Sequence, residues 1–140
     1  ASALDDRASR AVRAARACTD AALRAVRPGV RWPAVAEAVA RVAAEHRVSL
    51  LAGFDGHGIG RRLHEPPRCR LAGLTPEDDF VLRPGMVLTL EPTVLTGVPE
   101  VRTDADGWTQ RSVDGLPGAH HEVTVGVVRG GVRVLVDPLA

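Results

Sequence analysis

The sequence contains no lysine and no tyrosine, and its 140 residues include only two phenylalanines and two tryptophans. Its core must therefore be built mainly from Val, Leu and Ala. All 18 basic residues are arginines, set against 17 acidic residues, and they form no basic block. Such a block is what neutralises nucleic-acid phosphates. We therefore expect no nucleic acid among the partners of this protein.

Long apolar runs are also absent, because these residues show neither a signal-peptide pattern nor a membrane-spanning stretch. We expect no association with a membrane. The only cysteines, Cys18 and Cys69, are too few for a disulfide scaffold, and reduced thiols in the cytoplasm are the simplest interpretation. The length suits one domain, so residues 1–140 are treated as a single unit.

Two helices are predicted at the start of the chain, over residues 5–27 and 33–46. Apolar residues recur in both segments with a period near 3.6. Pro28-Gly29 ends the first helix, and Pro33 suits the first helical position of the second.

From residue 48 onward the pattern changes to short β-type runs separated by Gly, Pro and Asp. Asp106-Gly107 and Gly130-Gly131 indicate hairpin turns, whereas residues 66–84 are predicted to form the least ordered loop. The chain is therefore predicted to be an α+β domain in which two helices cover one face of an antiparallel sheet. The predicted strands are residues 48–54, 86–95, 98–103, 108–112, 119–128 and 132–136.

Alternation along the strands predicts which side chains leave the apolar layer. Along residues 86–92, Thr89 and Glu91 share the face opposite the leucines, and the helices are expected on the leucine side. Along residues 120–127, His120 and Glu122 lie opposite the valines. A carboxylate in such a strand is costly to desolvate unless it is paired, hydrogen-bonded or bound to a cation.

The segment GHGIGRRLHEPP, residues 56–67, adds two histidines, His57 and His64. One imidazole from His57 and the carboxylates of Glu91 and Glu122 would suit a divalent metal such as Mn, Fe, Co or Zn, with one or two ions. His64 would then be a nearby acid, base or hydrogen-bond donor. Each residue also has an ordinary alternative, since either glutamate can lie on a solvated face and His57 can be structural. Spacing alone leaves both interpretations open.

Four segments together resemble type I methionine aminopeptidases. The resemblance runs from about the first helix to the C-terminus. It implies a half or truncated pita-bread fold, with a curved antiparallel sheet covered by two helices, and an enzyme that removes N-terminal methionine from peptides. The segments are residues 56–67, 82–92 (LRPGMVLTLEP), 106–109 (DGWT) and 119–125 (AHHEVTV).

The resemblance also implies roles for individual residues. His57, Glu91 and Glu122 correspond to metal ligands, and Glu91 in addition to the general base. His64 corresponds to the histidine that contacts the substrate carbonyl or peptide nitrogen. The residues that correspond to the pocket for the N-terminal side chain are Phe54, Leu63 and Trp108.

The sequence departs from the family pattern in three respects. Asp55 replaces a common cysteine and His120 replaces a glutamine, which makes both residues candidate acid/base groups. Full-length members also carry two aspartate ligands on a hairpin before the position of the first helix, and this sequence begins after that hairpin. We therefore expect a homodimer, or a separate N-terminal half, to cover the open sheet edge and the cleft.

Two further functions stay open at this point. A half-length relative can be reused for non-peptide acid/base chemistry on a small molecule, as Asp55, His120 and the missing aspartates suggest. A non-catalytic module that binds peptides or proteins is the other alternative. The presence of Glu91 and Glu122 argues against a pure binder, which has no need of these carboxylates.

Overall fold

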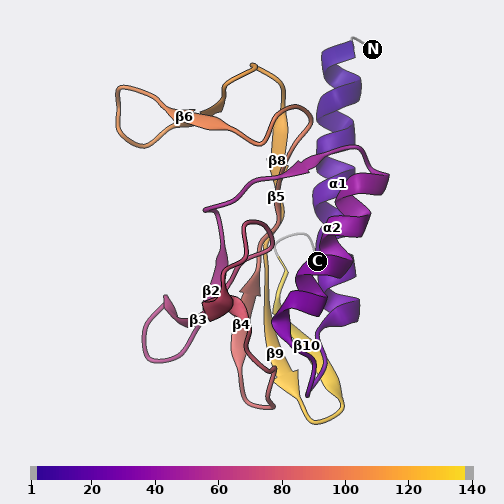
Figure 1. Ribbon diagram of the computed structural model, residues 1–140, viewed down its shortest axis with the longest axis vertical. Helices are drawn as coiled ribbons and strands as arrows, with labels where there is room; N and C mark the ends of the chain where they lie inside the picture. The colour runs from indigo at the N-terminus through magenta and orange to yellow at the C-terminus, as the bar shows by residue number, and fades with distance from the viewer. Residues whose placement is uncertain (1–2, 138–140) are drawn as a thin grey trace.

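The computed structural model describes residues 3–137 (Figure 1). Helices α1 (Ala3–Ala25) and α2 (Trp32–Glu45) pack side by side along one side of the molecule, and the strands lie on the other side. Both helices were predicted, with ends that differ by one or two residues. Pro33 lies in the first turn of α2, where its missing N–H has no helical partner to lose. No helix in residues 3–137 is both long and apolar enough to cross a bilayer.

The strands form three antiparallel sheets within the described residues. The largest has the order β10-β9-β4-β2-β3, a second has the order β1-β5-β8, and β6 pairs with β7. A short 3-10 helix, η1 (Pro76–Asp78), follows β3. The strands are β1 (Ser49–Leu50), β2 (Gly56–Gly58), β3 (Glu65–Cys69), β4 (Val87–Leu90), β5 (Thr93–Leu95), β6 (Val101–Thr103), β7 (Gln110–Ser112), β8 (Gly118–His120), β9 (Val123–Val128) and β10 (Gly131–Val136).

Two long predicted strands are each divided in two, which corrects the predictions for residues 86–95 and 119–128. The first is interrupted at Glu91-Pro92 and the second at His121-Glu122. Because β4 pairs with β9 and β5 pairs with β8, the two interruptions lie beside each other. Pro92 lacks the N–H that would continue a ladder. The β-structure therefore changes from one sheet to another at this point.

The core between the helices and the largest sheet is aliphatic, as the composition requires. Leu88 and Leu90 of β4 and Val125 of β9 are buried in one cluster with residues of both helices. The predicted leucine and valine faces are therefore confirmed. Trp32, the largest fully buried side chain, stacks on Phe80 with ring centroids 5.5 Å apart.

The segment of residues 66–84 is more ordered than predicted. It contributes β3, which pairs with β2, and η1, which ends at the buried Asp78. The Asp78 carboxylate accepts hydrogen bonds from Thr75 N at 2.7 Å and from Arg70 Nη1 at 3.0 Å. Burial opposes its ionisation, but the hydrogen bonds from Thr75 and Arg70 hold its pKa below the usual value. Hydrogen bonds between polar side chains and the backbone therefore order this segment, and a search for alternating apolar residues does not detect such interactions.

Three other strand predictions need correction in their bounds. Only Ser49–Leu50 of the predicted run 48–54 is a strand, and the strand β2 at Gly56–Gly58 was not predicted. The runs 98–103 and 108–112 pair only over β6 and β7. The predicted hairpin turns are confirmed, because Asp106-Gly107 lies between β6 and β7 and Gly130 lies between β9 and β10.

Candidate metal centre

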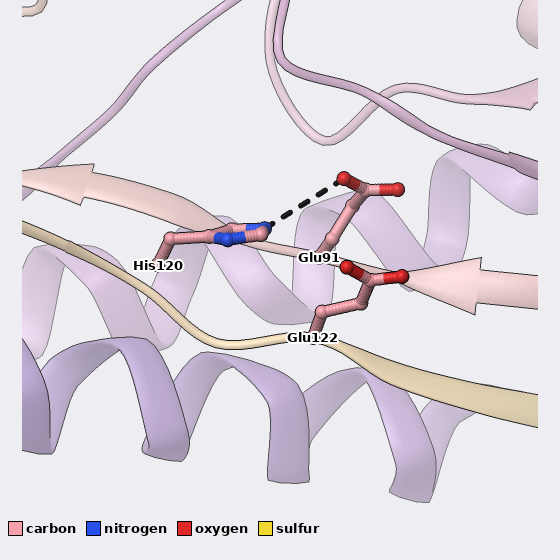
Figure 2. Close-up of side chains that lie close together, drawn as sticks. All are labelled: Glu91, His120 and Glu122. Carbon is pink, nitrogen blue, oxygen red and sulfur yellow. Dashed lines mark ion pairs between the residues drawn. The ribbon is translucent and has the colours of Figure 1, made fainter. Parts of the chain in front are cut away.

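Glu91 and Glu122 lie side by side where the β4–β5 and β8–β9 runs are interrupted. Glu91 directly follows β4, and Glu122 directly precedes β9. The pairs Leu90↔Val123 and Thr93↔His120 lie on either side of them, so the two glutamates are near neighbours across the ladder. Figure 2 shows both side chains on the side of the strands opposite the helix, which is the face that the sequence predicted for them.

His120 joins the two glutamates in one cluster (Figure 2). One ligand atom from each of Glu91, His120 and Glu122 lies within 4.8 Å of the others. His120 Nε2 is 3.6 Å from Glu91 Oε2. Two ligand atoms of one tetrahedral ion are about 3.4 Å apart when the bonds are about 2.1 Å long. Side-chain rotations that shorten the widest of these distances by up to about 1.4 Å would therefore let the three residues share an ion.

His57 lies on the other side of Glu91. Its Nε2 is 3.8 Å from Glu91 Oε1, and its Nδ1 is 2.9 Å from the carbonyl oxygen of Gly58. A carbonyl oxygen only accepts, so Nδ1 carries a proton, and in the neutral imidazole the lone pair of Nε2 is available to bind a cation. The Glu91 carboxylate therefore has an imidazole facing each of its oxygens. The sequence predicted His57 beside Glu91, and it gave His120 only an acid/base role.

The glycines on both sides of His57 have a packing reason. Strand β2 lies between β3 and β4, and both Gly56 and Gly58 are buried there. A Cβ atom on Gly56 would collide with the carbonyl oxygen of Thr89, and one on Gly58 would collide with that of Pro66. The two neighbouring strands can therefore approach β2 closely only because these positions carry no side chain.

Thr89 connects His57 with Glu91. Its buried hydroxyl accepts a hydrogen bond from the backbone N–H of His57 at 2.9 Å and donates one to Glu91 Oε1 at 2.7 Å. Alternation placed Thr89 on the face of Glu91, but the sequence reasoning assigned it no role. A threonine two residues before the candidate ligand, on the same face, was the signal that could have identified it.

The Glu91 carboxylate is mostly buried, yet it favours the charged form. Burial opposes its ionisation, but the interactions with His120 and Thr89 outweigh burial and hold its pKa below the usual value. The carboxylate in turn raises the pKa of the His120 imidazole. Glu91 is thus negatively charged at neutral pH and can act as a metal ligand or as a proton acceptor.

His64 and Asp55 lie in a cleft next to this cluster. The cleft has a volume of about 740 Å³ and is also lined by His57 and Arg70. The His64 ring lies 4.1 Å, centroid to centroid, from the ring of His57. The Asp55 carboxylate instead pairs with Arg70 Nε at 3.3 Å. His64 therefore lies beside the predicted ligand His57, whereas the Asp55 carboxylate already forms an ion pair with the guanidinium of Arg70.

The three predicted pocket residues are spread over the surface. Phe54 lines a second cleft of about 700 Å³ that reaches His120. Leu63 is 66% exposed and Trp108 is 87% exposed. Trp108 lies between β6 and β7, on the hairpin that projects away from the helices (Figure 1). Within residues 3–137, Leu63 and Trp108 are thus open to solvent.

Comparison with models of protein families identifies the family of this chain. The model of metallopeptidase family M24 matches residues 2–136. The chain belongs to this family. Among curated M24 relatives, it is 42% identical over 123 residues to methionine aminopeptidase of Treponema pallidum, which covers 86% of this chain and 48% of the relative. It is 38% identical over 114 residues to the Escherichia coli enzyme, covering 81% and 43% respectively.

Solved structures agree with the family assignment. Methionine aminopeptidase from Thermotoga maritima superposes with a TM-score of 0.87 at 34% identity, over 94% of this chain and 53% of that one. The enzyme from Rickettsia prowazekii gives a TM-score of 0.83 at 28% identity, over 90% and 51%. The predicted α+β, pita-bread-type fold is confirmed. This M24 chain spans about half the length of the relatives it matches.

The donor atoms of the cluster fit the divalent metal that an M24 metallopeptidase uses. Two carboxylates lie beside two imidazoles, one of which has its Nε2 lone pair free. This set of oxygen and nitrogen donors suits divalent ions of the first transition series.

Proposed function

We propose that this M24 chain is the metal-binding part of a metal-dependent aminopeptidase that removes N-terminal methionine from peptides. The observation that carries the proposal is the meeting of Glu91 and Glu122, from separate strands, on the face away from the helices. Methionine aminopeptidases that match four-fifths or more of the chain support the choice of substrate class.

The proposed ligands are His57, Glu91 and Glu122, which hold one or two ions of Mn, Fe, Co or Zn. A divalent ion at this position supplies Lewis acidity toward the scissile carbonyl and lowers the pKa of a water molecule. Glu91, kept ionised and oriented by the hydroxyl of Thr89, accepts a proton from the attacking water. His64, beside His57, donates a hydrogen bond to the substrate carbonyl or peptide nitrogen.

The proposed pocket for the methionine side chain consists of Phe54, Leu63 and Trp108. Because Leu63 and Trp108 are largely exposed, this pocket needs a cover from outside the described residues. A homodimer or a separate N-terminal half is the proposed cover, and the greater length of the relatives supports it. A cytoplasmic location is part of the same proposal. The two cysteines are free and buried, and burial raises the pKa of Cys18 to about 11.

The proposal is tested by release of free methionine from a Met-initiated tripeptide in the presence of Co²⁺ or Mn²⁺. Solution mass is measured in parallel, so that activity can be related to the oligomeric state. We expect Glu91→Gln to lower the rate by a factor on the order of 100 or more, because the proton acceptor is lost. Glu100→Gln changes an exposed glutamate outside the cluster and is the matched control. Metal binding without methionine release, in both monomer and homodimer, would contradict activity of this chain by itself.

A further inference from the structure

We propose that His120 is itself a metal ligand, additional to the proposed ligand His57, so that Glu91, His120 and Glu122 form a three-ligand set within this one chain. The inference rests on the proposed metal-dependent function. It differs from the ligand set that the family resemblance implies, in which His57 supplies the imidazole and the position of His120 is a glutamine.

The backbone brings His120 and Glu122 to the same ion. The two residues are separated by one residue, and a ligand atom of each lies within 4.8 Å of the other. His120 ends β8 opposite Thr93, and Glu122 precedes β9, so both approach the Glu91-Pro92 interruption. Figure 2 shows the His120 ring directed toward Glu91, with Glu122 beside it. His57, by contrast, approaches Glu91 from β2 and faces its other oxygen, Oε1.

The charges of the cluster also favour a cation. Two carboxylates with oxygen atoms this close repel each other, and a dication neutralises both. An ion pair between His120 and Glu91 would neutralise the charge of only one of the two carboxylates. Because 46% of the His120 side chain is exposed, the ring can turn toward an ion without disturbing the core.

His120 stands where the family pattern has a glutamine, and this replacement changes which metal ions the site prefers. Imidazole nitrogen is a strong ligand for Zn, Co and Fe, whereas a neutral amide oxygen suits harder cations. Three protein ligands with further positions open is the usual arrangement of a catalytic zinc site. We therefore expect these three residues to hold an ion without a further protein ligand.

The test is titration of Co²⁺ into the 140-residue chain and three histidine variants, followed by calorimetry and by the visible spectrum of the bound ion. His120→Gln introduces the residue that the family pattern has, and we expect it to raise the Kd at least about tenfold and to change the spectrum as a nitrogen ligand is lost. His57→Gln reports on the other imidazole. His46→Gln, at the end of α2 and outside the cluster, is the control and should leave both readouts unchanged. Circular dichroism verifies that each variant is folded.

Each result separates the two proposals. An unchanged Kd and spectrum in His120→Gln overturns the role of His120. If His57→Gln alone weakens binding, the ligand set implied by the family stands and only this inference fails. If the folded wild-type chain binds no Co²⁺, both the three-ligand site and a metal-dependent function of this chain by itself fail.

Discussion

The hydroxyl of Thr89 donates a hydrogen bond to Glu91 Oε1 at 2.7 Å. The same hydroxyl accepts the backbone N–H of His57, and the Thr89 side chain is buried. One side chain thus sets both the position of a strand and the orientation of a carboxylate. In a buried location, no water can take over these hydrogen bonds without a rearrangement of the strands.

Replacing Thr89 by valine removes this hydroxyl while keeping the shape of the side chain. We expect the free energy of unfolding to fall by about 1–3 kcal/mol, because the His57 N–H loses its acceptor. Metal affinity should fall by roughly 10–100-fold, as expected when a residue that orients a ligand is lost. Urea unfolding and Co²⁺ titration measure the two effects. Thr89→Ser keeps the hydroxyl and should lie close to wild type, and equal behaviour of the valine and serine variants would refute the argument.

Metal binding should stabilise the folded chain. At a free ion concentration of about 100 times the Kd, a ligand that binds only the folded state adds about 2.7 kcal/mol. For a domain of this size the melting temperature should then rise by on the order of 10 °C. Melting curves with and without Co²⁺, and after addition of a chelator, measure the shift. Glu122→Gln should abolish most of it, whereas a rise that persists in this variant would place the ion elsewhere.

Replacing Asp78 by asparagine should destabilise the chain in a manner that depends on pH. The Asp78 pKa is below its usual value in the folded state. Its contribution is therefore fully present above the unfolded pKa of about 3.9 and is lost as the pH falls through the lower, folded pKa. At neutral pH we expect a loss of about 1.5–3 kcal/mol, the range for hydrogen bonds to a charged group. The difference from wild type should shrink in acid.

Asp79 provides the matched control for this experiment. Its carboxylate pairs with Arg31, but both side chains are exposed. Asp79→Asn should therefore lower the free energy of unfolding much less than Asp78→Asn does. Urea unfolding of both variants between neutral and acidic pH makes the comparison. An Asp78→Asn loss that stays constant in acid would show that packing, and not charge, is responsible.

A methyl group at Gly58 should force β2 and β3 apart. The added Cβ of Gly58→Ala would collide with the carbonyl oxygen of Pro66, which is backbone and cannot rotate away. We expect a loss of about 1–3 kcal/mol, as for other overpacked sites, together with weaker Co²⁺ binding because His57 is displaced. Gly130→Ala is the control, since no atom lies within 4 Å of its added Cβ. Equal stability of the two variants would contradict the close packing around β2.

Local signals explain which parts of the fold were predicted. Both helices follow from the period of their alanines and valines, and both hairpin turns follow from short glycine-containing pairs. The strand β3 and the buried Asp78 were missed because Arg70, Thr75 and Asp78 are polar residues in a loop-like sequence. Their order depends on mutual hydrogen bonds, which no pattern of hydrophobicity reports. The exposed Trp108 likewise could not be distinguished from a covered one by its sequence neighbours.

The sequence by itself determined that Glu91 and Glu122 lie away from the aliphatic layer, because alternation along an extended chain is a local property. Only the tertiary structure decided which imidazole meets both carboxylates. That outcome depends on the register of β4 with β9 and of β5 with β8, which brings His120 to the cluster and leaves His57 on the far side of Glu91. The register between strands that are distant in sequence is set by the packing of the whole core, so it cannot be predicted from a single segment.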